Sequence, residues 1–425
     1  MEILNFSLYL LLFVWVWKRR KKNYTLLFLI SIWLISAFVG IFYVRMDVYR
    51  EGDKIELFPF LYLFMLFVIF LIPLFRQKVS LYKISYKNEK ILDLSALFIG
   101  LLSLWPFFEF LIRIGYSIKT GEFFLLGSMY DSVGRGESER LIQLTRIGSI
   151  LTNVSMMFKV ISPVLFLYYV SKFPEKKVLA LFMFVNAIIP SLSNVSSGGK
   201  TQIVFFLFYL STLFLFAKGI FTLRQKAKLT NLLVSCGVTV LALILILSVS
   251  RYYLTERVNS VSDTGDFLFK YTAESMYNFN QLGYHEEKTL DGYMTMSSVF
   301  ADLGLSEIRY TDIDNKYLDV INYFGSKMKS SPWLFYTLFG DVYLDFGLVA
   351  TIFIFVIISY IVSSLHIKIE MDLSNVILLS LYFYIATTSL FYFCFKTSFR
   401  PIYMTLLYCI FLKFASEKMN PKSRF

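Results

Sequence analysis

The sequence predicts an all-α, polytopic integral membrane protein with about eleven transmembrane helices and a large extracytoplasmic loop before the last three. Of the 425 residues, 57% are hydrophobic and 17% are charged, whereas a soluble domain has about 45–50% and 25%. A water-soluble fold could not bury 46 Phe and 29 Tyr. These residues lie in long apolar runs. Inside the hydrocarbon core of a membrane such runs must be helical, because each unpaired backbone group there costs several kcal/mol.

Eleven apolar runs are candidates for spans, which need about 20 residues each. The first, sixth, seventh and eleventh are short, so the predicted number of spans depends most on them. All eleven belong to one polytopic domain over residues 1–425. In chain order the runs are Ile3–Trp17, Tyr24–Val44, Leu57–Phe75, Ile91–Ile112, Leu151–Val170, Val178–Leu192, Ile203–Ala217, Leu229–Ser250, Phe346–Leu365, Val376–Phe395 and Pro401–Phe414.

Clusters of Lys and Arg follow every second run, and such clusters mark cytoplasmic loops. The N-terminus is therefore expected outside and the C-terminus in the cytoplasm. The long polar insert at 251–333 then lies outside, where chemistry must proceed without ATP or nucleotide sugars. Its many aromatic residues predict short helices that cap the membrane face. The basic clusters are Lys18–Lys22, Arg76–Lys90, Lys172–Lys177, Lys218–Lys228 and the tail from Lys413.

Charge and metal-binding residue types exclude two further classes. The net charge of +12 is concentrated in the loops, with no basic stripe among aromatic residues, so no nucleic acid is expected as a partner. Three cysteines lie in apolar runs without metal-ligand spacing, and there are only two histidines. The sequence therefore predicts no metal site and no cofactor.

A short turn between the sixth and seventh runs carries Gly198, Gly199 and Lys200. It is not a nucleotide-binding P-loop, because Asn194 stands where that motif needs its first glycine. Exposed backbone amides beside a cation can bind a phosphate or pyrophosphate. The alternative is a tight turn whose lysine extends to the interface.

Four arginines in the expected outside segments are further candidates for binding pyrophosphate, because guanidinium groups form bidentate pairs with phosphate oxygens. A solvated surface that faces lipid headgroups is the alternative for each. Arg251 directly follows an apolar run, which holds it at the interface. The four are Arg135, Arg140, Arg251 and Arg257.

Two carboxylates, Asp341 and Asp345, stand four residues apart just before the ninth run, so a helix would place them on one face. An ionisable group that enters the membrane is a candidate functional residue, and a carboxylate there can act as a general base. The alternative is that one of them stabilises the first turn of the span. His285 is a further candidate for a base or phosphate contact, or else a surface histidine.

Two features point to pairing inside the spans. Glu109 and Arg113 lie one helical turn apart and predict an ion pair. Lys159 lies within the fifth run, so it is expected to contact a partner or to face a cavity.

The layout and two motifs resemble the Wzy-type polymerases of bacterial O-antigen and capsule assembly. The turn at Ser197–Thr201 is similar to a small-residue-plus-cation turn between their central spans. The segment from Pro332 to Gly347, with Asp345-Phe346-Gly347, is similar to the entry to one of their late spans. Some members carry an arginine followed, after ten residues, by a glycine in two outside loops, and no outside arginine here has that spacing.

The resemblance implies a glycosyltransferase of the bacterial inner membrane that needs neither metal nor nucleotide. It would transfer a glycan en bloc from undecaprenyl pyrophosphate onto an incoming lipid-linked repeat unit. Lys200, Arg251 and Arg135 would bind the leaving pyrophosphate, and Arg140 and Arg257 are the second-ranked candidates. Asp341 or Asp345 would be the base, with His285 in reserve. Membrane lipid, a chain-length regulator and a flippase are the partners this implies.

Three alternatives remain at this point. An O-antigen ligase performs the same chemistry with a lipid A core as acceptor and has nearly the same layout. A flippase or other transporter of lipid-linked oligosaccharides would carry polar residues along a central cavity, whereas here they lie in outside loops. A purely structural membrane protein would leave Lys200 and the aspartate pair unexplained.

Overall fold

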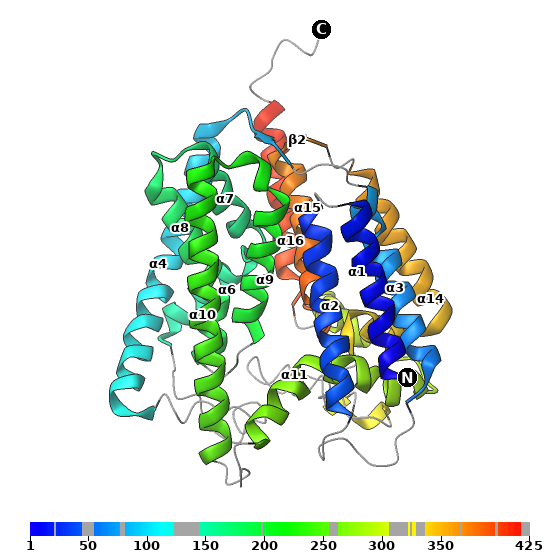
Figure 1. The fold of residues 1–425 in the computed structure, drawn as a ribbon. Coiled ribbons are helices and arrows are strands. Elements are labelled where there is room, and N and C mark those ends of the chain that lie inside the picture. Colours follow the sequence, from blue (N-terminus) through cyan, green and yellow to red (C-terminus); the bar gives the residue numbers. More distant parts are fainter. Residues whose placement is uncertain are drawn as a thin grey trace. The chain divides into compact units, whose positions relative to one another are not determined.

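The computed structural model describes most of the chain and divides it into two compact units (Figure 1). Unit 1 comprises Met1–Val79, Asn259–Ile367 and Ile385–Phe399; unit 2 comprises Ser80–Val258, Lys368–Tyr384 and Arg400–Phe425. The backbone of 247–254 and 262–271, and of residue 244, is described without side chains. The described residues are 1–20, 23–44, 55–76, 81–122, 144–196, 199, 201–254, 262–305, 322–323, 325–328, 336–365, 368–395 and 398–417.

Unit 1 contains the first three helices of the chain together with the helices of the long insert. Its elements are α1 (Glu2–Arg19), α2 (Tyr24–Tyr43), α3 (Leu57–Arg76), α11 (Ser262–Gln281), η3 (Gly283–His285), α12 (Tyr293–Asp302) and α14 (Thr337–Ser364). The last residues of α15 and the turn at 389–395 complete it. The described part of the insert therefore includes helices, as its composition predicts.

Unit 2 contains the central helices and the C-terminal helix. Its elements are β1 (Lys83–Ser85), α4 (Glu89–Thr120), α6 (Arg146–Met157), α7 (Ile161–Lys172), α8 (Lys177–Ser196), α9 (Thr201–Phe216), η2 (Lys218–Ile220), α10 (Leu223–Leu254), β2 (Glu370–Asp372), most of α15 (Leu373–Thr388) and α16 (Arg400–Glu417). β1 and β2 form a two-stranded parallel sheet, with Ser85 opposite Asp372.

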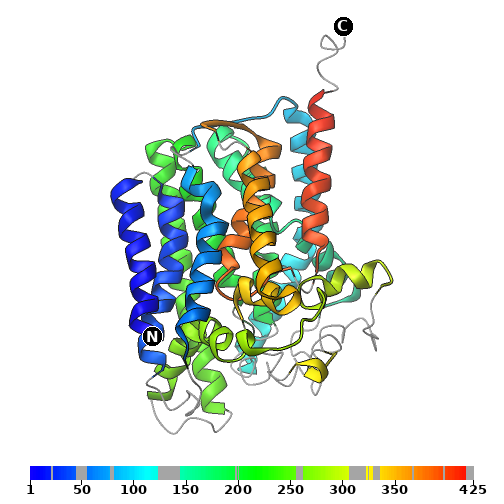
Figure 2. The ribbon, with the colours of Figure 1, turned by 90° about the vertical axis from the view of Figure 1, so that its right-hand side faces the viewer.

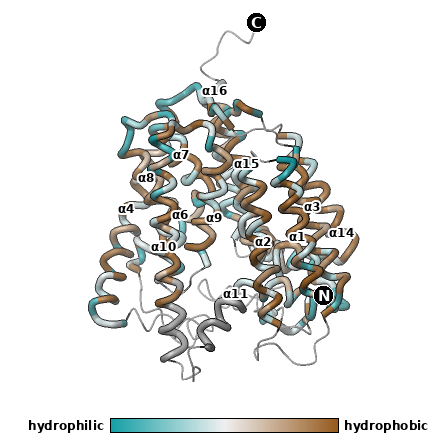
Figure 3. Tube along the Cα trace, in the orientation of Figure 1, coloured by the Kyte–Doolittle hydropathy of each residue, from teal (hydrophilic) through white to brown (hydrophobic). Residues whose placement is uncertain are grey.

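Each of the eleven predicted runs overlaps helix in the structure, so the all-α membrane fold is confirmed in its coarse form. Among the described residues, six helices are long and apolar enough to cross a membrane, or seven if α6 and α7 form one bent span. The six are α2, α3, α4, α8, α10 and α14. Figure 3 shows the hydrophobic stretches along α3, α10 and α14. The number eleven stays a prediction.

Two spans differ from their predicted form. The fifth is broken: α6 and α7 meet at 70°. Pro163 lies in the first turn of α7, and its missing N–H removes the bond that a continuous helix would make to the carbonyl of Lys159. The tenth ends at Thr388 instead of Phe395, and the chain after it forms a turn.

Aromatic side chains form much of the unit 1 core, where Trp33 stacks on Phe67 at 4.7 Å and Phe339 packs at 4.8 Å from Phe355. At one end of this unit the insert meets the N-terminal helices. The Asn280 amide exchanges two hydrogen bonds with the backbone of Glu56, at 3.0 and 2.7 Å. Figures 1 and 2 show the N-terminus and the start of α14 at this same end, which agrees with the predicted alternation of the spans.

At one end of unit 2 the lysine-rich loops gather. Asn88 donates to the carbonyl of Ala415 at 3.2 Å, and Lys176 pairs with Asp93 at 2.6 Å. The β1–β2 sheet joins the segment before α4 to the segment before α15. The loops that gather here are ones that the predicted alternation of spans places in the cytoplasm, and the side of the membrane that this end faces stays a prediction.

Candidate functional site

The start of α14 is a short, separate helix, because Gly347 interrupts it. Gly347 has φ 72° and ψ −178°, a conformation that is essentially restricted to glycine. The carbonyl of Leu344, freed by this break, accepts from the amide of Leu290 at 2.9 Å. After the break, the Thr351 hydroxyl donates to the carbonyl of Gly347 and the Tyr62 hydroxyl donates to that of Leu348, both at 2.7 Å. The segment Thr337–Phe346 is thus held apart from the long apolar helix that follows it.

The first turn of α14 is fixed by a strained threonine. Thr337 has φ 71°, which is rare for a β-branched residue. Its hydroxyl accepts from the amide of Gly340 at 3.1 Å and so caps the helix. Strain of this kind costs about 1–3 kcal/mol and persists only where the surroundings impose it. Here the backbone amide of Thr337 donates to the carbonyl of Phe391 at 3.0 Å.

Asp345 caps a helix of the long insert. Its Oδ1 accepts from the amide of Met294 at 2.7 Å, and its Oδ2 accepts from the amide and the hydroxyl of Thr295, both at 2.6 Å. These are the second and third residues of α12, and Gly292, the N-cap residue just before this helix, has φ 86°. A buried carboxylate at a helix N-terminus satisfies two unpaired amides and interacts favourably with the helix dipole.

Asp341 lies one turn earlier and contacts a different element. Its side chain is fully buried, and its Oδ2 accepts from the amide of Phe393 at 2.8 Å. Phe393 belongs to the 389–395 turn, which is fastened to α14 because Leu338 donates to the carbonyl of Ser389 at 2.8 Å. The predicted helical spacing of the two aspartates is confirmed, and the pair joins α14 to both α12 and this turn.

Aromatic residues gather beside the aspartate helix. The Tyr343 hydroxyl donates to the carbonyl of Tyr284 at 3.0 Å, and the two rings stack at 5.6 Å. Phe279 meets Tyr343 edge-on at 5.3 Å. His285 is exposed and lies 5.6 Å from the Tyr284 ring. The structure therefore brings His285 to this aromatic cluster and not into the hydrogen bonds of Asp341 or Asp345.

Gly199 lies in unit 2, in the turn between α8 and α9. Its amide donates to the carbonyl of Asn194 at 2.8 Å, and an added Cβ would lie 2.3 Å from the Asn194 side chain. The Asn194 side chain also accepts from the amide of Gln202 at 3.2 Å. This close contact with Asn194 is a sufficient reason for a glycine at position 199, and no ligand is needed to explain it. It therefore favours the interpretation of Gly199 as part of a tight turn.

The predicted cations lie almost entirely outside the described residues. Arg251 lies on α10, three residues before its end, and only its backbone is described. That these cations form one site with the aspartate pair stays a prediction. Outside the described residues are Lys200, Arg135, Arg140 and Arg257, together with Gly198.

Both predicted pairings within spans have counterparts. Arg113 pairs with Glu109 at 3.0 Å, which confirms the predicted ion pair. Sequence reasoning missed that Glu109 also accepts from the Thr145 hydroxyl at 2.9 Å and so holds the start of α6. Lys159, at the α6–α7 bend, lies 5.0 Å from the centre of the Tyr384 ring, a cation–π contact.

Comparisons with protein-family models, with curated proteins and with solved structures find no match. Within the described ranges, no three His, Cys, Asp or Glu side chains gather where they could hold a metal ion. The aspartate helix, with its two buried carboxylates and its aromatic neighbours, is therefore the candidate site that rests on the geometry of this chain.

Proposed function

We propose that this protein polymerises lipid-linked oligosaccharide repeat units for O-antigen or capsular polysaccharide at the outer face of the bacterial inner membrane. The observation that carries the proposal is the buried Asp341 at the start of a membrane helix, on the end of unit 1 where the long insert packs. A carboxylate at that depth is costly, and such groups mark functional sites in membrane proteins.

The two aspartates have different roles in this proposal. Asp345 gives both oxygens to three donors of α12, so a substrate hydroxyl would have to compete with all of them. Asp341 accepts instead from a turn, at Phe393. A shift of that turn would remove this contact without unfolding a helix. Asp341 is therefore the proposed general base, and Asp345 holds α12 in place beside it.

The reaction transfers the glycan between two membrane-anchored molecules. A hydroxyl oxygen of the incoming repeat unit attacks the anomeric carbon of the growing glycan, and Asp341 takes the proton. The bond from that carbon to the pyrophosphate oxygen breaks, and the lipid pyrophosphate leaves with the electron pair. In the proposal, Lys200, Arg251 and Arg135 stabilise this leaving charge, which is electrostatic catalysis by fixed cations.

The aromatic cluster supplies surfaces for the sugars. Tyr284 and Tyr343 stack on each other and are both partly exposed where the insert meets α14. Sugar rings present C–H groups that pack well on aromatic faces. Because these residues come from both the insert and α14, the cap and the membrane helix would bind the substrate together.

The test is a reconstituted reaction. The full chain is placed in liposomes with labelled lipid-linked repeat units and without any nucleotide sugar. We expect lipid-linked glycans of two and more units, with one lipid pyrophosphate released for each unit added. Two results would overturn the proposal. The glycan could stay at one repeat unit although the lipid-linked substrate is present, or transfer could occur only when a lipid A core acceptor is added. The second result would indicate a ligase.

A further inference from the structure

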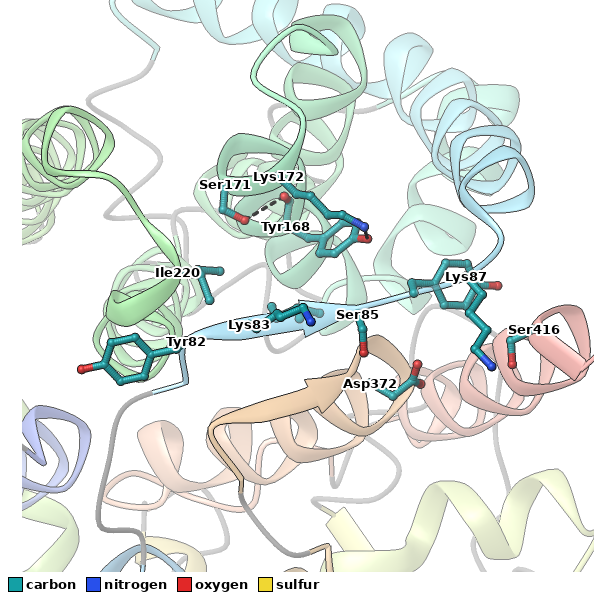
Figure 4. Close-up of a pocket in the computed structure, with 12 residues that line it drawn as sticks. Tyr82, Lys83, Ser85, Lys87, Tyr168, Ser171, Lys172, Ile220, Asp372 and Ser416 are labelled. Carbon is teal, nitrogen blue, oxygen red and sulfur yellow. Dashed lines mark hydrogen bonds between the residues drawn. The ribbon is translucent and has the colours of Figure 1, made fainter.

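At the lysine-rich end of unit 2 the chain forms an open recess of about 480 Å³. It lies between β1, β2, the end of α7 and the end of α16 (Figure 4). Its volume falls within the range of sites for small molecules, about 300–1,000 Å³. None of its described lining residues belongs to the aspartate site, so a ligand bound here would be independent of the proposed function.

Three lysines line the recess. Lys87 is exposed, and within the described residues it forms no ion pair. Lys83 pairs with Glu370 at 2.8 Å, but the two side chains are 66% and 51% exposed, so the pair is weak and can be exchanged for another anion. Lys172 pairs with Glu89 at 3.2 Å, again with both side chains partly exposed.

One carboxylate stands among these lysines. Asp372 lies opposite Ser85 in the β1–β2 register, and Figure 4 shows the two side chains on facing strands. Its Oδ2 accepts from the amide of Ser374 at 3.0 Å. Burial is the main cause that raises the pKa of Tyr86 to about 12, and the nearby charge of Asp372 is the second cause. At neutral pH the Tyr86 hydroxyl therefore adds no negative charge. The described lining residues thus carry three positive charges and one negative charge, and Glu370 and Glu89, which do not line the recess, pair with two of the lysines.

This combination selects a ligand with two kinds of group. A phosphate would be bound by the lysines, and a nearby hydroxyl would donate to the carboxylate. Figure 4 shows Lys172 on one side of β1, and Lys87 beyond the end of β1 on the side where Asp372 lies. We propose that the recess binds a phosphate group that carries a neighbouring hydroxyl, as in a glycerol phosphate.

Two sources could supply this chemistry. One is the headgroup of an anionic phospholipid such as phosphatidylglycerol, since the recess lies where α7 and α16 end and α4 begins, and basic pockets at that level bind lipid headgroups. The other is a soluble glycerol phosphate. The acyl chains of the lipid would pack on apolar helix surface, whereas the soluble molecule has no acyl chains. Binding measurements with each ligand therefore distinguish the two sources.

The test measures binding by the purified full chain in neutral detergent, by native mass spectrometry for phosphatidylglycerol and by calorimetry for glycerol 3-phosphate. Binding of either ligand is expected to weaken about five-fold in each of Lys87→Gln and Lys172→Gln. The matched control is Lys90→Gln, an exposed lysine on the same end that does not line the recess, and it should bind like the wild type.

The lipid comparison uses phosphatidylmethanol, which has the same charge and no hydroxyl, and it should bind more weakly than phosphatidylglycerol. Saturable binding of the lipid alone assigns the headgroup, and saturable binding of the soluble ester assigns the free ligand. Binding of neither, or equal binding by Lys87→Gln, Lys172→Gln and the control, overturns the proposal. Because Lys87 is exposed, its variant should fold normally, and a wild-type melting temperature checks this.

Discussion

Thr295 donates both its amide and its hydroxyl to Oδ2 of Asp345, each at 2.6 Å. The two residues are 50 positions apart in the chain. One belongs to the insert and the other to the start of a membrane helix, so this contact fastens the insert to the membrane part of unit 1.

Removal of the cap should destabilise the protein. In Asp345→Ala the amides of Met294 and Thr295 lose their acceptor, and each buried unsatisfied group costs about 1–3 kcal/mol. We expect a lower melting temperature in detergent, and a smaller loss in Asp345→Asn, whose amide oxygen can still accept. Asp302→Asn, on the exposed end of α12, is the control. A wild-type melting temperature for Asp345→Ala would contradict the capping role.

Removal of the proposed base should abolish activity and leave the fold intact. In Asp341→Asn an oxygen remains to accept from the Phe393 amide, so the protein level and melting temperature should match the wild type. Without a carboxylate no proton is taken from the acceptor hydroxyl, and cells that carry this variant should produce surface glycan of one repeat unit. A full ladder of chain lengths would remove Asp341 from the mechanism.

The break in α14 should depend on glycine at 347. An added Cβ would find room, because its nearest neighbour is Thr289 Cγ2 at 3.6 Å. The cost of Gly347→Ala is therefore in the backbone, about 1–3 kcal/mol at φ 72°. Gly115→Ala on α4, where nothing lies within 4 Å, should stabilise by about 0.5–1 kcal/mol. Equal melting temperatures for the two variants would show that the break is not enforced by Gly347.

Labelling of single cysteines tests the predicted sidedness. The three native cysteines are replaced by alanine, and Lys288→Cys or Lys87→Cys is added, since both lysines are exposed. A membrane-impermeant maleimide should label Lys288→Cys in intact spheroplasts and Lys87→Cys only after lysis. Labelling of Lys87→Cys in intact spheroplasts would reverse the topology and remove the argument that the insert has no access to nucleotides.

The helices could be predicted because lipid imposes a simple rule: an apolar run must satisfy its own backbone. The i, i+4 spacing likewise placed Asp341 and Asp345 on one helix. The break before Pro163 had a local signal as well, since a proline removes one helical hydrogen bond. Gly347 carried a similar signal, but a glycine within an apolar run does not by itself reveal a positive φ.

The partners of the aspartates could not be predicted. Asp345 meets Thr295 and Asp341 meets Phe393 at separations of 50 and 52 residues, and no periodicity connects such positions. The recess at Lys87 could not be predicted for the same reason, because it depends on the pairing of β1 with β2, which are far apart in the chain. The sequence pattern specifies the helices. Tertiary contacts decide that Asp345, and not the similar Asp341, caps another helix.

The surface glycan of a strain that lacks the gene tests the central claim most directly. If the protein polymerises lipid-linked repeat units, export and attachment continue without it, and gel electrophoresis should show glycan of a single repeat unit that returns to a ladder when the wild-type gene is restored. Complete loss of surface glycan would contradict the claim and point to a flippase or a ligase. An unchanged ladder would contradict any role in chain extension.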